Sequence, residues 1–438
     1  MPGTGCAFLY LVRENGIVIQ TEYKAGEIME DRTLERYKRN ISRVSAGSLK
    51  QLTSSRDIPE GLGYFTDVLR KTFVDFEKDD NEYIGSYCVM VPDEMIYAFG
   101  YRPLRLCAGH SVAAMIGDEI VPRDACPVLK ATAGFHAMRV MPIYQQCKFA
   151  VLPMTCDGKR KSAALLSQYL PVIPLPLEMD KSEDRFAQNL QNMHALMKSI
   201  SKETGRRFSN RKLIESCKSI NAAQQEAYKL YALLSSDNPS VMGSQVMAVL
   251  NSYCYDTPES WTQHAKMLNA GLSHKAAVMQ PLKRKKPRIF IAGSPITFPN
   301  YKLPFLMESL GAQIVGDETC MAGRLLYDPV VPDDYSTDGI LRALTARYVC
   351  ACTCPVFEQT DDRLSSLTEK LRQTKAEGVI YHILRGCTPY DFELSMVEQL
   401  AEKLNIPVLR VETDFSAEDA EQVKIRLEAF VELIEQRR

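Results

Sequence analysis

The spacing of hydrophobic residues divides this chain into stretches of different type. Up to residue 84, apolar side chains recur at intervals of three and four, as in Leu34, Tyr37, Ile41 and Val44. This period places them on one face of a helix. We therefore predict that residues 1–84 form a helical amino-terminal region.

Short apolar runs of β character follow residue 85 and alternate with helical stretches. The runs are Cys88–Val91, Arg102–Leu106, Phe149–Met154 and Val172–Leu175. Strands that alternate with helices are typical of a parallel sheet covered by helices. We predict that residues 85–180 form a first α/β domain.

Residues 181–285 lose the strand pattern and carry long polar helical stretches, Arg185–Lys202 and Asn210–Leu234. We interpret this region as a helical connector. It ends in the basic run Lys283–Arg288, which leads into an apolar strand. Such a run marks a linker more often than a nucleic-acid patch, so it indicates a domain boundary.

Residues 286–438 return to the alternating pattern and predict a second α/β domain. A final helix is predicted to start at Ser416, with Asp419 at its third position in a weak form of the capping box. The predicted strands are Ile289–Ala292, Gln313–Val315, Tyr348–Cys352, Gly378–Ile383 and Val408–Val411.

Charge and hydropathy exclude several kinds of partner. The 53 basic and 54 acidic residues give a net charge of −1, which provides no general attraction to nucleic acid or an anionic membrane. The apolar stretch Ala7–Val12 is too short for a signal sequence, and no run approaches a membrane span. We expect a cytoplasmic protein with small-molecule or protein partners.

The 13 cysteines are the most informative residues for function. A reduced thiolate is a soft ligand, so cysteines in an intracellular chain indicate iron–sulfur or zinc sites before disulfides. The chain has no Cys-x2-Cys pair and no paired-histidine motif, so zinc-ribbon and ferredoxin patterns are absent. A metal site here would be assembled by the fold.

Ligands of α/β sheets gather at the carboxyl ends of the strands. Cys107, Cys156 and Cys387 follow predicted strands, and Cys320 follows one after a short loop. Cys126 precedes Pro127 at a predicted helix start, where the helix dipole favours a thiolate. These positions predict thiols from two domains facing one cleft.

Three further cysteines alternate along the predicted strand near residue 350. Cys352 and Cys354 are favoured as ligands because Pro355 ends the strand there, whereas Cys350 is interpreted as structural. Core packing remains the commoner role of any single cysteine. The cysteines interpreted in that way are Cys6, Cys147, Cys217 and Cys254.

The turn Gly293-Ser294-Pro295 follows the first strand of the second domain. Its small residues allow backbone amides to approach a ligand, and Ser294 is a candidate to hydrogen-bond a substrate oxygen; an ordinary tight turn explains it equally well. Neither a dinucleotide fingerprint nor a P-loop occurs, so ATP hydrolysis would belong to another protein.

Several segments together resemble the 2-hydroxyacyl-CoA dehydratase family, which includes benzoyl-CoA reductase subunits and the double-cubane cluster proteins. The similarity covers about residues 85–435, and the second and fourth segments are specific. The segments are Cys126-Pro127, Thr155–Lys161, Gly293–Pro295 with Pro299–Lys302, Gly386–Glu393 and Val411–Asp414.

The resemblance implies two Rossmann-like (flavodoxin-like) α/β domains with an iron–sulfur cluster between them, in a homodimer or beside a related subunit. It implies that a separate ATP-hydrolysing iron–sulfur activator delivers low-potential electrons. The cysteines that match a single [4Fe-4S] cluster are Cys126, Cys156 and Cys387. In the double-cubane branch the further candidates are Cys107, Cys320 and one of Cys352 or Cys354, with Cys88 beside the cluster rather than bound to it.

The resemblance leaves two enzyme hypotheses. The number of cysteines favours a double-cubane, ATP-coupled reductase of a small molecule. The turn at Ser294 favours a dehydratase component, in which a ketyl radical derived from a 2-hydroxyacyl-CoA expels the hydroxyl group. A third hypothesis is a non-catalytic cluster carrier or zinc-stabilised scaffold.

Overall fold

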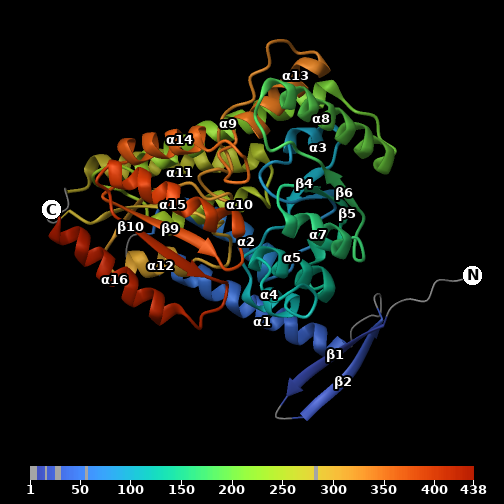
Figure 1. The fold of residues 1–438 in the computed structure, drawn as a ribbon, viewed down its shortest axis with the longest axis horizontal. Coiled ribbons are helices and arrows are strands. Elements are labelled where there is room, and N and C mark those ends of the chain that lie inside the picture. Colours follow the sequence, from blue (N-terminus) through green and yellow to red (C-terminus); the bar gives the residue numbers. More distant parts are fainter. Residues whose placement is uncertain (1–6, 15–16, 25–30, 55–57, 281–284) are drawn as a thin grey trace, which may run out of the picture.

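Two four-stranded parallel sheets form the centre of the computed structural model, which describes residues 7–14, 17–24, 31–54, 58–280 and 285–438 (Figure 1). The first sheet has the order β4-β3-β5-β6. Its strands are β3 (Tyr83–Ser86), β4 (Arg102–Arg105), β5 (Cys147–Pro153) and β6 (Val172–Leu175). The helices of this first lobe are α3 (Asp93–Ala98), α4 (Ser111–Gly117), α5 (Pro127–Met138), α6 (Pro142–Gln145) and α7 (Asp157–Leu166).

The second sheet has the order β10-β9-β7-β8. Its strands are β7 (Arg288–Gly293), β8 (Gln313–Asp317), β9 (Gly378–Leu384) and β10 (Val408–Thr413). The helical elements of this second lobe are α12 (Lys302–Ser309), α13 (Thr337–Thr345), the π-helical turn η1 (Ala346–Cys350), α14 (Asp361–Gln373), α15 (Thr388–Lys403) and α16 (Ala420–Gln436).

The two sheets have the same topology. In each, the first strand of the lobe is flanked by the second and third, and the fourth lies beyond the third. Every strand pair in both sheets is parallel, and β7 and β9 are buried along their whole length. This is the doubly wound order, so the predicted α/β fold with two Rossmann-like lobes is confirmed.

The remaining helices pack around the lobes. Helix α10 is buried at every position and contacts α2 and β8. The helices that lie outside the two lobes are α1 (Asp31–Leu52), α2 (Leu62–Phe73), α8 (Glu183–Thr204), α9 (Asn210–Leu234), α10 (Gly243–Tyr253) and α11 (Pro258–Val278). In the described ranges, none of the helices is long and apolar enough to cross a membrane.

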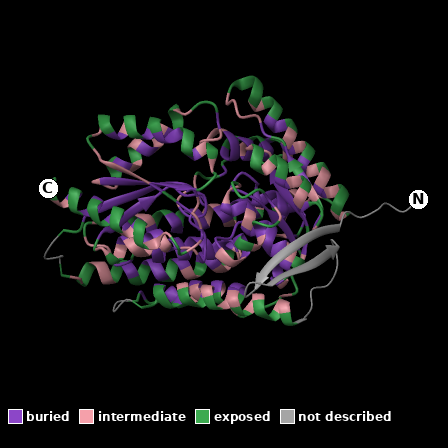
Figure 2. Cartoon of the chain, turned by 60° about the horizontal axis from the view of Figure 1, so that its bottom comes forward, coloured by how far each residue is buried: buried purple, intermediate pink, exposed green. Residues whose placement is uncertain are grey.

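One hydrophobic core runs through both lobes and the helices between them, so buried residues form a continuous region in Figure 2. A second, smaller core lies on the other face of the second sheet, where Phe290 and Tyr381 pack with Leu367 and Leu394 of α14 and α15. The shared core fixes the relative position of the two lobes.

The amino-terminal region differs from its prediction. Strands β1 (Ala7–Glu14) and β2 (Ile17–Lys24) form an antiparallel pair before α1, so the region is not wholly helical. The sequence could have predicted this strand pair, because Asn15-Gly16 between two runs rich in β-branched and aromatic residues is typical of a hairpin.

Two other predicted strands are wrong. Cys88–Val91 is a buried loop that follows β3, and Tyr348–Cys352 overlaps η1 rather than a strand. Short buried apolar runs do not distinguish a strand from a buried helical turn or loop. The last helix starts at Ala420 rather than Ser416, because the Asp419 carboxylate binds Lys302 and Thr413 instead of forming a capping box.

Candidate metal centre

The two lobes meet where their strand-end loops touch. Gly386 has a φ of 76°, and a Cβ atom at this position would lie 2.1 Å from the carbonyl oxygen of Asp124. Gly109 donates its backbone N–H to the carbonyl of Phe298 at 2.9 Å. Glycine is required at Gly386 because the backbones approach so closely, and this contact brings the neighbouring Cys126 and Cys387 together.

Three of the predicted ligands share one local structure. Cys126 is the N-cap residue of α5, Cys156 of α7 and Cys387 of α15. At each helix start the free backbone N–H groups and the helix dipole favour a negative charge on sulfur. Each of these three thiols therefore lies at the amino-terminal end of a helix.

Cys126 and Cys387 interact directly across the lobe interface. A hydrogen bond from the Cys387 thiol lowers the pKa of Cys126, and the N–H groups of Val128 and Leu129 act in the same direction. The same bond raises the pKa of Cys387. The charge of Cys156 also acts on Cys126, so these three thiols share one neighbourhood.

A second group of thiols belongs to the second lobe. Cys320, Cys352 and Cys354 are buried, and their charges act on one another. Burial raises the pKa of Cys352 to about 11. The Sγ atom of Cys320 lies 3.6 Å from the hydroxyl oxygen of Tyr390.

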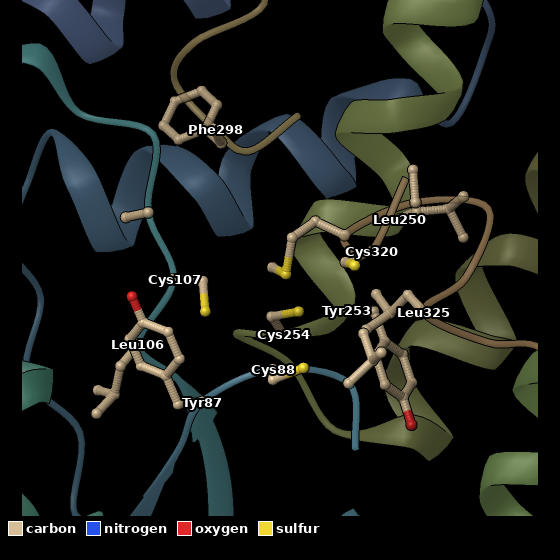
Figure 3. Packing of buried hydrophobic residues seen from close by; sticks show 14 of the residues in the cluster. Tyr87, Cys88, Leu106, Cys107, Leu250, Tyr253, Cys254, Phe298, Cys320 and Leu325 are labelled. Atoms are coloured by element: carbon tan, nitrogen blue, oxygen red, sulfur yellow. The ribbon is translucent and has the colours of Figure 1, made fainter. Parts of the chain in front are cut away.

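The first lobe contributes two more thiols. Figure 3 shows Cys88, Cys107 and Cys320 lying around one space, together with Cys254 of the connector. Cys88 has a φ of 74°, an uncommon conformation for a residue with a side chain. Burial raises the pKa of Cys107 to about 11. Burial also acts to raise the pKa of Cys88, but Lys159, the backbone N–H of Met90 and the charge of Arg105 together outweigh it and lower that pKa.

Corresponding loops of the two lobes carry corresponding residues. Cys88 follows the first strand of its lobe and Ser294 the first strand of the other. The loops after the second strands carry Cys107 and Cys320, and those after the third strands carry Cys156 and Cys387. The candidate site is therefore built twice, with a hydroxyl replacing one thiol.

Ser294 lies in a closed environment. Its side chain is fully buried, and its Oγ accepts a hydrogen bond of 3.0 Å from the backbone N–H of Leu384. Its hydroxyl also interacts with the thiol of Cys387. These contacts join the ends of β7 and β9 beside Cys387.

Two cations face the thiols. Lys159 is half-buried and donates a 2.8 Å hydrogen bond to Oγ1 of Thr155. Burial alone would lower the pKa of Lys159, but the charges of Cys88 and Cys156 raise it above its usual value. Arg324 of the second lobe is buried beside Cys320. Lys159 lies in the Thr155–Lys161 segment that carries the family resemblance, whereas no sequence motif pointed to Arg324.

The other cysteines differ in their surroundings. Burial raises the pKa of Cys147 and Cys254 to about 12, and also raises that of Cys217. Cys254 lies beside the thiols of Figure 3, although it was predicted only as a core residue. Cys350 is partly exposed on η1, and Cys6 lies outside the described residues.

The donor set fits an iron–sulfur cluster better than a single ion. In the part of the chain that is described, no three Cys, His, Asp or Glu side chains are close enough to hold one metal ion. A cluster keeps its thiolates apart, because iron and sulfide lie between them. The grouped thiols and the nearby cations suit a group of that size and negative charge.

Comparison with known proteins identifies the family of this chain. Residues 88–434 match the family described as 2-hydroxyglutaryl-CoA dehydratase, D-component. The chain belongs to this family. The predicted relationship to 2-hydroxyacyl-CoA dehydratases and benzoyl-CoA reductases is thus confirmed.

Curated relatives span most of the chain. "Putative dehydratase subunit YjiM" of Escherichia coli (strain K12) is 26% identical and covers 86% of this chain and 99% of its own. Lactoyl-CoA dehydratase subunit beta of Anaerotignum propionicum is 22% identical, covering 80% and 91%. A benzoyl-CoA reductase subunit of Thauera aromatica is 22% identical, covering 76% and 86%. The family thus consists of dehydratase and reductase components.

Proposed function

We propose that this protein is the iron–sulfur component of a 2-hydroxyacyl-CoA dehydratase. The observation that carries the proposal is the meeting of three thiols at helix starts, Cys126 and Cys156 of the first lobe and Cys387 of the second. Relatives named as dehydratase beta subunits support the substrate class. This differs from the sequence-based preference, which was the double-cubane reductase.

The proposed cofactor is a [4Fe-4S] cluster on these three thiols, and when bound it supplies one-electron transfer at low potential. The electrons come from a separate ATP-hydrolysing iron–sulfur activator. The substrate is a 2-hydroxyacyl-CoA, from which water is eliminated. A second subunit, either a copy of this chain or a related one, completes the enzyme.

The residues of this chain have defined tasks in the proposal. The N–H groups of Val128 and Leu129 at the start of α5 stabilise the thiolate form of Cys126. Lys159 offsets negative charge at its edge of the site. The close backbone contact between Gly386 and Asp124 holds the two lobes together beside Cys126 and Cys387.

A metal and activity assay tests the proposal. The full chain, purified without oxygen, is expected to contain about four irons and about four sulfides. With the activator, ATP and the second subunit, it should convert a 2-hydroxyacyl-CoA to the enoyl-CoA. A preparation that holds iron and sulfide but dehydrates no acyl-CoA would contradict the function and leave the cluster assignment standing.

A double-cubane reductase is the second candidate. The further buried thiols favour it, because Cys107, Cys320, Cys352 and Cys354 lie near the first group and Cys88 lies between the lobes. About eight irons per chain would support this candidate. Zinc alone would support the scaffold hypothesis instead.

A further inference from the structure

Arg324 is an unusual residue among the buried charges of this protein. Its side chain is 1% exposed, and its Nε atom has no hydrogen-bond partner. One terminal nitrogen donates to the carbonyl of Thr353 at 2.8 Å, and the other donates to the hydroxyl of Tyr390. Within the described ranges no carboxylate forms an ion pair with it.

Every other buried arginine of the described residues has a carboxylate partner. Arg363 is the closest comparison, because it is 2% exposed and also donates to Thr353, yet it pairs with both Glu318 and Glu393. The remaining pairs are Arg105 with Asp93, Arg288 with Asp237 and Arg347 with Glu94. Among these arginines, Arg324 alone forms no ion pair with a carboxylate. The charge of Glu318 also acts on Arg324, but the Glu318 carboxylate is paired with Arg363.

An uncompensated buried charge costs several kcal/mol, and proteins keep one only where an anion neutralises it. The groups around Arg324 show where that anion belongs. The charges of Cys320 and Cys354 act on the guanidinium, and Tyr390 contacts both Arg324 and the Cys320 sulfur. The unpaired Nε therefore lies in the neighbourhood of the thiols.

We propose that Arg324 is the positioned counter-charge of the iron–sulfur cluster, held toward Cys320 by the hydroxyl of Tyr390. The inference rests on the proposed iron–sulfur site in its double-cubane form, because the thiols that act on Arg324 are Cys320 and Cys354. It adds a role for two residues outside the ligand set. Positive charge beside a cluster stabilises the electron that it accepts. Arg324 thus raises the reduction potential, and Tyr390 keeps the guanidinium in place.

The test compares variants of the full chain, purified without oxygen, by potentiometric titration followed by electron paramagnetic resonance. Arg324→Met is expected to shift the midpoint potential to a more negative value. Arg324→Lys should keep the midpoint potential close to that of the wild type, because lysine retains the positive charge. Tyr390→Phe should give a smaller negative shift, and it provides the test if Arg324→Met does not fold.

Thermal unfolding supplies a second readout. Arg324→Met should stabilise the chain after its iron is removed, because an uncompensated buried charge is lost, and should destabilise the iron-loaded chain. Arg288→Met is the matched control, since this buried arginine has its own carboxylate and acts on no thiol. It should destabilise both forms and leave the potential unchanged.

The outcomes separate this inference from the proposed function. A wild-type chain that binds no iron and sulfide would overturn both. An iron-loaded chain whose potential is the same in wild type, Arg324→Met and Tyr390→Phe would overturn the role of Arg324 alone. A stability change of the same sign with and without iron would also count against it.

Discussion

The two α/β lobes share one strand order, yet corresponding loops carry different chemistry. After the first strand, the first lobe has Cys88 in a left-handed conformation, whereas the second has Ser294 bonded to the backbone of its own sheet. After the third strand, both lobes place a cysteine at the start of a helix. The difference is thus local, because the backbone topology is the same.

The positive charges of the site also differ between the two lobes. The first lobe supplies Lys159 from α7, and the second supplies Arg324 from the loop after β8. Each lobe therefore contributes thiols and one cation to the site, but the two cations lie at different positions in the shared topology. We conclude that the two halves of the site are unequal, and the following changes test that inequality.

The largest effect is expected from the helix-capping thiols that both lobes share. Cys156→Ala should abolish the broad brown absorption of the iron-loaded protein and most of its bound iron, because it removes one of three proposed ligands. Cys217→Ala, in the core of the connector helix α9, should leave both unchanged. Equal colour in the two variants would refute the ligand assignment.

A large loss of stability is expected where the lobes touch. Gly386→Ala places a Cβ 2.1 Å from the Asp124 carbonyl, so the free energy of unfolding should fall by about 3 kcal/mol or more. Gly205 has a similar φ of 67° but open space around it, and Gly205→Ala should cost about 1 kcal/mol. Equal losses in chemical denaturation would show that the lobes are not held by this contact.

Acid should destabilise both lobes through buried histidines. Burial lowers the pKa of His110 and His136 in the first lobe, and of His382 in the second, to about 4 from 6.5. The unfolded chain binds protons that the folded chain does not, so stability is complete above pH 6.5 and falls as the pH drops toward 4. Each histidine should account for about 3 kcal/mol at pH 4.

Denaturation measured between pH 7 and pH 4 checks this dependence. His110→Asn should reduce the loss of stability between pH 7 and pH 4 by about 3 kcal/mol, since asparagine cannot take up a proton but still caps α4. The exposed His274→Asn serves as the control. An unchanged slope in His110→Asn would contradict the assignment.

The smallest effect is expected from making the two lobes alike. Cys88→Ser copies the residue of the second lobe into the first, and in the proposed single-cluster protein the iron content should stay at about four per chain. A loss of half the iron would instead favour the double-cubane candidate. Elemental analysis of the variant beside Ser294→Cys sharpens the comparison.

Much of the fold was predictable because parallel strands are buried on both faces. The runs at β5, β7 and β9 are apolar except for Lys148, Arg288 and His382, and the long connector helices carry a clear helical period. The predictions failed at Cys88–Val91 and Tyr348–Cys352, where apolar residues are buried without forming strands. The apolar composition of these two segments indicates that they are buried. It does not indicate a strand, because turns and loops can be buried as well.

The candidate site likewise contains residues that the sequence could predict and residues that it could not. The helix starts at Cys126, Cys156 and Cys387 were predictable, because each lies at a boundary marked by a strand end or a proline. Arg324 gave no such signal, since its importance lies in the carboxylate that it lacks. A missing partner is a property of three-dimensional surroundings.

The sequence by itself determined two α/β lobes with parallel sheets, long helices between them and a chain rich in thiols, because periodicity and residue type act locally along the chain. Only the tertiary structure decided which thiols of the two lobes meet, that Ser294 is fully buried and that, among the described residues, Arg324 forms no ion pair with a carboxylate. The physical reason is that these properties depend on close approach between segments distant in the chain, such as Gly386 and Asp124.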